Sequence, residues 1–320
     1  MVMSFSPCEV PYLVSLQYPK QLYRYQLNQS DVSLYSVPYC STSLVLPHCV
    51  HCTVVINRKT VERLDMRTGR QLEVLPDAPF PLSNAVVVPT CEGLLALWTN
   101  SRAFRLSFST RLWSSTKSDV EKLPSLYCLL SSAKLVLLYA HTIWLTNRTS
   151  YFSEGTIEGK IFDIDKGESV AFALQLDLVG HFGCVEAGDG QVLLFGGYEE
   201  MRCGGSALLD SNCDLYLLDT TTFQVKKVGS LPRKLEEPNL TNRPVVYQNY
   251  VHCLSGRELL RIHLPSLSSH ITRLSCLQTL NILRLLWLYE RLRGRRTAVG
   301  QLPPCLVRET ALYLSAVPRS

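Results

Sequence analysis

The segment His48-Cys-Val-His-Cys52 holds the densest group of metal-binding side chains in the chain. Imidazole and thiolate are the preferred protein ligands of zinc and copper, and Cys49 and Cys52 form a Cys-x-x-Cys motif. A tetrahedral site would need a second Cys or His pair at finger spacing, and none follows. If the segment is one strand, residues three apart point to opposite faces, so the two thiols cannot converge. We therefore expect buried core cysteines here and no bound metal or cofactor.

Motifs for catalysis are scarce in the rest of the sequence. The chain contains no P-loop, dinucleotide-binding glycine pattern, nucleophile elbow or His-Glu-x-x-His motif. Asp163 and Asp165 are paired carboxylates, but their place in a recurring pattern predicts that they cap a turn. The seven histidines are spread along the chain without the spacing of a ligand set.

Composition favours a folded protein that does not bind nucleic acid and does not span a membrane. Of 320 residues, 46% are hydrophobic and 18% charged, and the net charge is +5 with no long basic run before residue 270. The N-terminus lacks a secretory signal pattern, and twelve scattered cysteines fit reduced thiols in the cytoplasm. The apolar stretch 125–145 contains Lys134 and His141, which predicts two buried strands rather than a membrane helix.

A short pattern recurs six times, at intervals that average about 47 residues. It consists of an apolar residue, a bulky residue, usually Arg, an apolar residue and a polar residue. The occurrences are Leu22–Gln26, Val61–Asp65, Ala103–Ser107, Ile161–Asp165, Leu215–Asp219 and Leu259–His263. An apolar strand precedes most of them, and a turn with a second short strand follows, so the unit is an antiparallel meander.

One unit carries a specific family resemblance. Residues 190–232 run from an apolar strand into Gly196-Gly197, through a long polar loop to Asp214-Leu-Tyr-Leu-Leu-Asp219, and end at Leu231-Pro232. This order resembles a Kelch repeat, whereas the other units lack the glycine doublet. The resemblance implies an all-β propeller of about six, or alternatively seven, four-stranded blades. WD-type and quinoprotein-type propellers share the fold. The Trp-Asp dipeptide of WD-type blades is absent from this sequence, and the Thr-Gly turn of quinoprotein-type blades is offered once, within Arg67-Thr-Gly-Arg70.

The repeats divide the chain into three parts. Residues 1–274 are expected to form the propeller, 275–296 an amphipathic helix, and 297–320 a strand-like tail that could close the ring. The first unit has no room for an inner strand, which is why closure by the tail is attractive. The helix either packs on the propeller wall or docks into a partner.

The arginines at the third pattern position are expected to serve packing between blades. Arg24, Arg63, Arg105 and Arg261 would pair with an acid or a backbone group of the neighbouring blade. The alternative is a ring of exposed basic residues that binds a partner.

The Kelch resemblance implies a non-catalytic scaffold or adaptor that binds protein partners in the cytoplasm, the cytoskeleton being one setting. The alternative is a propeller enzyme with a polar or metal-containing pocket at the axis, where several histidines could meet. The loops after the apolar strands should emerge on one face and bind the partner. The longest of them is 198–213. The candidate residues are Arg58, Asn100, His141, Tyr198, Glu199, Glu200, Arg202 and Arg257.

Overall fold

The computed structural model describes the chain from Tyr12 to Arg273, apart from several short segments and one longer one. The residues within this span that are not described are 18–20, 28–31, 37–42, 50–51, 67, 83–84, 91, 99–101, 125, 140–155, 177, 189, 204–205, 234–243 and 256–257. The predicted helix 275–296 and tail 297–320 therefore lie outside the described residues, as do Asn100, His141 and Arg257. The chain divides into two compact units, residues 1–271 and 272–320, and the first contains the propeller strands except for the last two residues of β24.

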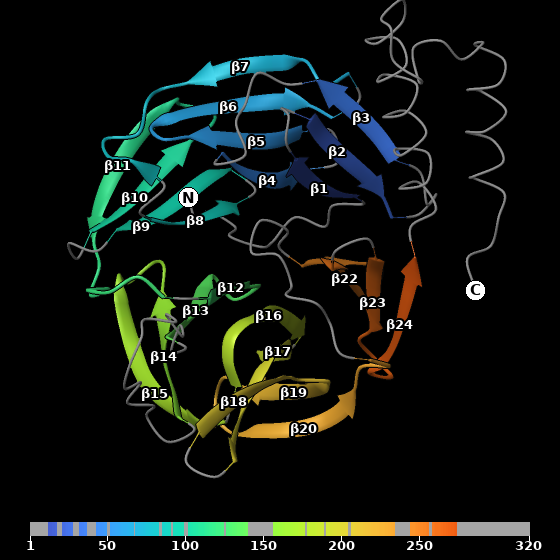
Figure 1. The fold of residues 1–320 in the computed structure, drawn as a ribbon. Coiled ribbons are helices and arrows are strands. Elements are labelled where there is room, and N and C mark those ends of the chain that lie inside the picture. Colours follow the sequence, from blue (N-terminus) through green and yellow to red (C-terminus); the bar gives the residue numbers. More distant parts are fainter. Residues whose placement is uncertain are drawn as a thin grey trace, which may run out of the picture. The chain divides into compact units, whose positions relative to one another are not determined.

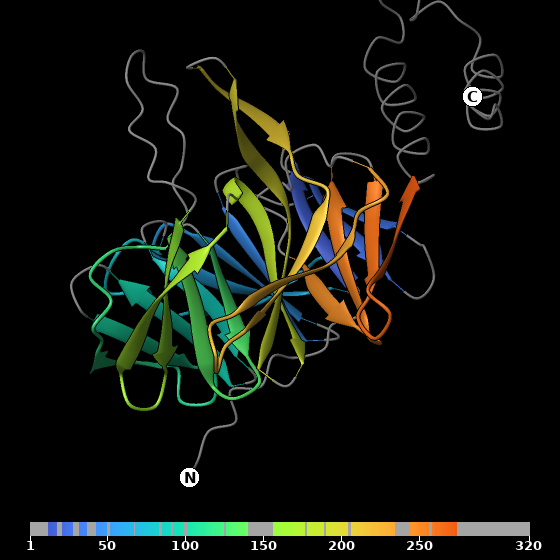
Figure 2. The ribbon, with the colours of Figure 1, turned by 90° about the horizontal axis from the view of Figure 1, so that it is seen from below.

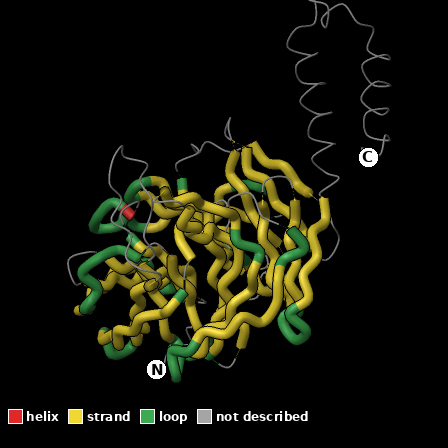
Figure 3. The backbone as a smooth tube through the Cα atoms, turned by 60° about the horizontal axis from the view of Figure 1, so that its bottom comes forward, coloured by secondary structure: helices red, strands yellow, loops and turns green. Residues whose placement is uncertain are grey.

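The described chain is almost entirely strand and turn (Figure 3). Its strands form six antiparallel sheets that radiate from a common centre (Figure 1). The sheets are β1 (Tyr12–Gln17), β2 (Gln21–Gln26) and β3 (Val32–Ser36); β4 (Leu44–Cys49), β5 (Cys52–Asn57), β6 (Thr60–Asp65) and β7 (Gln71–Leu75); β8 (Val86–Thr90), β9 (Gly93–Trp98), β10 (Arg102–Ser107) and β11 (Leu112–Lys117); β12 (Leu126–Leu130), β13 (Lys134–Tyr139), β14 (Thr156–Asp163) and β15 (Glu168–Gln175); β16 (Leu178–Gly188), β17 (Gln191–Cys203), β18 (Ser206–Ser211), β19 (Asp214–Asp219) and β20 (Val225–Ser230); and β21 (Val245–Tyr247), β22 (Tyr250–Ser255), β23 (Glu258–His263) and β24 (Ser268–Arg273).

The protein is thus an all-β propeller, as expected, but the predicted number of four-stranded blades is wrong. Five blades carry the four-strand meander, and the sheet β1–β3 has three strands. In that sheet β1 pairs with the pattern strand β2, as β5 pairs with β6 in the next blade. Among the described residues, the strand without a counterpart in this sheet is the innermost one, whereas the apolar strand before the pattern, which the first unit was expected to lack, is present as β1.

The six pattern segments lie on equivalent strands: β2, β6, β10, β14, β19 and β23. Each pairs with the apolar strand before it and the outer strand after it. In the blade β12–β15 the predicted alignment of the pattern is wrong by two residues. The pattern was expected to end at Asp165, as it ends at Asp65 in the blade β4–β7, but β14 ends at Asp163. The backbone shows this directly, since Gly69 N donates to Asp65 O and Gly167 N donates to Asp163 O in the same four-residue turn.

The core lies between the blades, not inside any one of them. Successive side chains of a strand point to opposite faces, so each apolar second strand contacts two neighbouring sheets. On β9, Leu94 packs toward the β4–β7 blade and Leu95 toward the β12–β15 blade. This explains why the second strands read as continuous apolar runs. The innermost strands are the ones before them, β4, β8, β12, β16 and β21.

The stretch 125–145 contains two strands, β12 and β13, as predicted. Among the described residues, no helix has the length and apolar character needed to cross a bilayer.

Candidate functional site

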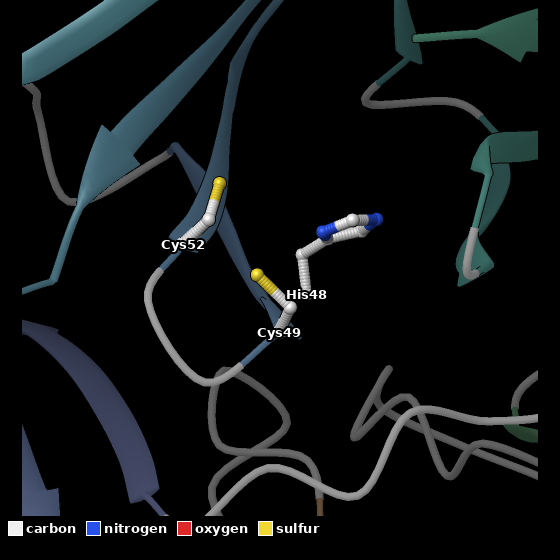
Figure 4. A group of neighbouring side chains, drawn as sticks. All are labelled: His48, Cys49 and Cys52. Carbon is white, nitrogen blue, oxygen red and sulfur yellow. The ribbon is translucent and has the colours of Figure 1, made fainter. Parts of the chain in front are cut away.

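The segment His48 to Cys52 adopts a geometry that differs from the expected single strand. β4 ends at Cys49 and β5 begins at Cys52, and the two cysteines are direct partners across this hairpin. The residues therefore face the same side, and the argument that their thiols must diverge is wrong. One nitrogen of His48 and the sulfurs of Cys49 and Cys52 all lie within 4.8 Å of one another (Figure 4).

Three neighbouring sheets hold this group in place. The Tyr12 hydroxyl, from the β1–β3 sheet, lies 2.7 Å from the carbonyl oxygens of both Cys49 and Cys52. His48 Nε2 lies 2.9 Å from Thr90 O of the next blade, and the His48 ring packs against Phe108 at 4.8 Å between centroids. The group therefore lies where the first three sheets meet.

The electrostatics of the group reflect burial and mutual contact. The pKa of the Cys52 thiol is raised, first by its hydrogen bond with Cys49 and then by burial, while Arg63 opposes this rise. Arg63 Nε donates to Cys52 Sγ at 3.3 Å, and its Nη1 donates to Glu73 at 2.5 Å. Burial also raises the pKa of Tyr12, so its hydroxyl stays protonated as a donor.

Three of the four arginines of the repeated pattern contact the neighbouring blade, whereas Arg261 lies over the Tyr250 ring of its own blade at 4.7 Å. Arg24 Nη1 donates to Met66 O at 3.0 Å, and Arg105 Nη2 donates to Ile164 O. Met66 and Ile164 occupy the same place, directly after the last strand residue of their blades. Arg63 lies over the Phe108 ring, which follows Ser107 in the same way, at 5.0 Å. These contacts confirm pairing with the next blade for Arg24 and Arg105.

The predicted loop 198–213 is instead a β-hairpin. β17 continues past its blade to Cys203 and pairs with β18, from Tyr198 opposite Ser211 to Cys203 opposite Ser206. Figure 2 shows this hairpin rising beyond the ends of the other strands. The backbone of Glu199, Glu200 and Arg202 therefore lies on a projecting strand.

The glycine doublet marks the base of this hairpin. Gly196 and Gly197 have φ angles of 71° and 80°, so the strand leaves the blade through positive φ, which glycine adopts without strain. Buried Asn212 secures the return: its N–H donates to Gly197 O at 2.9 Å and its side-chain amide to Gly196 O at 3.2 Å.

The structure describes only some of the binding residues predicted from the sequence, and they lie on different blades. Arg58 lies in the short turn between β5 and β6 with a φ of 55°, the position equivalent to the projecting hairpin in its own blade. Tyr198 starts the paired part of the hairpin. Asp163 caps a turn as predicted, because its Oδ1 accepts from the N–H of Asp165 and Lys166 at 3.1 and 3.0 Å.

Sequence comparison finds no matching family model and no matching curated protein. Comparison of structures finds many similar chains, among them two proteins of low sequence identity. BamB from Moraxella catarrhalis is 11% identical, with 77% of this chain and 67% of that chain aligned and a TM-score of 0.39. The protein YjhT is 10% identical, with 85% and 98% of the two chains aligned and a TM-score of 0.54. At such identity, the match to YjhT supports the β-propeller fold and nothing finer.

Proposed function

We propose that this protein is a non-catalytic, Kelch-like scaffold of the cytoplasm that binds a protein partner through the β17–β18 hairpin. The observation that carries the proposal is the projection of this hairpin beyond its blade (Figure 2). In the blade of β4–β7 the same connection is the two-residue turn at Arg58 and Lys59. An element that adds nothing to the ring and is displayed by a rigid scaffold is typical of a binding element.

The hairpin also has the composition of a contact surface. Its sequence combines charged Glu199, Glu200 and Arg202 with apolar Met201 and the pair Leu208-Leu209. The outer edge of β18 pairs with no strand among the described residues, so a partner's extended segment could add to it.

The alternative, an enzyme with an axial pocket, finds less support. On the described innermost strands of the five blades, the single carboxylate is Glu186, and these strands carry no Lys or Arg. Glu186 is engaged by Ser131, whose backbone N–H and hydroxyl lie 2.8 and 2.7 Å from its oxygens.

The test is a photo-crosslinking experiment with the full chain in extract of its source cells. A photoreactive residue at Met201 should crosslink a discrete protein, whereas the same residue at exposed Val170 on β15 should not. The triple variant Glu199→Ala, Glu200→Ala, Arg202→Ala should reduce recovery of that protein with nearly unchanged Tm. A control triple of exposed residues, Arg102→Ala, Glu121→Ala, Glu168→Ala, should bind normally.

Equal recovery with the hairpin triple and the control triple would contradict the placement. Loss of recovery only on deletion of 279–296 would move the interface to that segment.

A further inference from the structure

The hairpin between β4 and β5 brings together the donor atoms of a metal site. Cys49 Sγ, Cys52 Sγ and a His48 nitrogen lie within 4.8 Å of one another, and the group has three members in the part of the chain that the structure describes. A tetrahedral Zn²⁺ site places ligand atoms about 3.5–3.8 Å apart, given Zn–S of about 2.3 Å and Zn–N of about 2.0 Å. The donor atoms would therefore have to approach one another by about 1 Å to surround one ion.

The protonation of His48 suits a ligand. A carbonyl oxygen only accepts, so Nε2 must carry the proton that it donates to Thr90 O at 2.9 Å. Nδ1 then presents a lone pair, and this buried atom has no hydrogen-bond partner. It is the nitrogen nearer the two sulfurs in Figure 4. Histidines that bind metals commonly donate their other N–H to a backbone carbonyl in this way.

The surroundings would hold the group in shape and balance its charge. His48 is 6% exposed and Cys52 is 2% exposed, so water competes little for these donors. Arg63 places a positive charge 3.3 Å from Cys52 Sγ, which would offset the negative charge of a thiolate. Tyr12 fixes the hairpin through its contacts with Cys49 O and Cys52 O.

We infer that His48 Nδ1, Cys49 Sγ and Cys52 Sγ bind one Zn²⁺ ion, with water in the fourth position. Two thiolates and one imidazole form a soft to borderline donor set, which favours zinc over the hard cations Mg²⁺ and Ca²⁺. Binding releases the proton of each thiol. The site lies where three sheets meet, so the ion would brace the part of the ring that holds the β1–β3 sheet, in which the described residues form three strands.

The experiment uses the full chain, purified under reducing conditions and freed of metal with a chelator. Zn²⁺ added in competition with a chromogenic chelator should bind at one equivalent and raise Tm. Co²⁺ in its place should give the visible bands of tetrahedral cobalt and a thiolate charge-transfer band. Cys49→Ser and His48→Asn should each weaken Zn²⁺ binding by more than about 100-fold and remove the rise in Tm.

The matched control is Cys184→Ser, because Cys184 also lies against a second thiol, Cys128, but without an imidazole in the group. This variant should bind Zn²⁺ normally. Cys49 is only half-buried, so Cys49→Ser should fold, and its far-UV circular dichroism checks this. Absence of binding by the reduced chain, a Cys49–Cys52 disulfide that persists under these conditions, or equal loss with Cys184→Ser would each overturn the inference.

Discussion

At the scale of single residues, buried His252 links the stability of the propeller to pH. Burial is the main cause that lowers its pKa from 6.5 to about 4, and Arg261, its cross-strand partner, adds to the effect. The unfolded chain therefore binds a proton between these values that the folded chain does not. Stability is full above pH 6.5 and falls as pH decreases toward 4.

We expect the loss of unfolding free energy between pH 7 and 4.5 to be smaller in His252→Gln than in the wild type by about 2 kcal/mol. Urea unfolding at a series of pH values measures it. The comparison uses the change of unfolding free energy with pH, so a change in unfolding free energy that the substitution causes equally at every pH does not affect it. Exposed His270→Gln should keep the wild-type slope; identical slopes in all three proteins would be inconsistent with this role of His252.

Arg105 gives a second prediction at this scale. Its guanidinium donates to Ile164 O in the next blade, and the side chain is 24% exposed. Arg105→Met keeps the aliphatic stem but leaves that carbonyl without this donor, so stability should fall by about 1.5–3 kcal/mol. Arg102→Met on the same strand is exposed and should change stability by less than about 0.5 kcal/mol. Equal values for the two variants in urea unfolding would contradict the interblade role.

At the scale of elements, the glycines at the base of the hairpin are needed for its backbone. Gly197 has a φ of 80°, so Gly197→Ala places a Cβ in a disfavoured conformation and should cost about 1–2 kcal/mol. Gly229→Ala is the matched control, since its Cβ would meet only ordinary contacts at 3.5 Å. Thermal and urea unfolding of both variants measure the difference, and an equal effect would mean that strain at Gly197 is not the cause.

Much of the element structure could be predicted from the sequence, and the failures have physical reasons. The apolar strands before the pattern could be recognised because both faces of strands such as β9 and β13 are buried. The hairpin at Cys49 and Cys52 was missed because Val50 and His51, between the strands, are not turn-forming residues. Without turn-forming residues, the sequence predicts one continuous strand instead of two. In a single strand Cys49 and Cys52 would point to opposite faces, so the sequence did not predict the candidate metal site.

The register of the fourth blade shows a second limit. A shift by two residues leaves every side chain on the same face, so alternation cannot distinguish Asp163 from Asp165 as the end of the strand. The long connection in the fifth blade looked like a polar loop because Glu199, Glu200 and Arg202 are not typical strand residues. Pairing with β18, which no local pattern reveals, makes this segment a strand.

At the scale of the whole molecule, shared cores should make the ring unfold as a unit. Phe162 is 1% exposed and packs in the core between the β8–β11 and β12–β15 blades. Phe162→Ala should lower the free energy of unfolding by about 3–5 kcal/mol. It should also lower hydrogen-exchange protection by the same amount in β5 and β6, which do not contribute to that core. Unchanged protection in β5 and β6 would show that the blades unfold independently.

The connection between the second and third strands of a blade has a further consequence, for protein engineering. In one blade it is Arg58 and Lys59, and in another it is an entire extra hairpin, yet β5–β6 and β17–β19 pair in the same antiparallel way on either side of it. Chain inserted at this point is thus decoupled from the architecture that supports it, and a longer loop adds little closure entropy. The turn at Arg58 is accordingly an attractive graft position, where a foreign recognition hairpin could be installed without redesigning the blade.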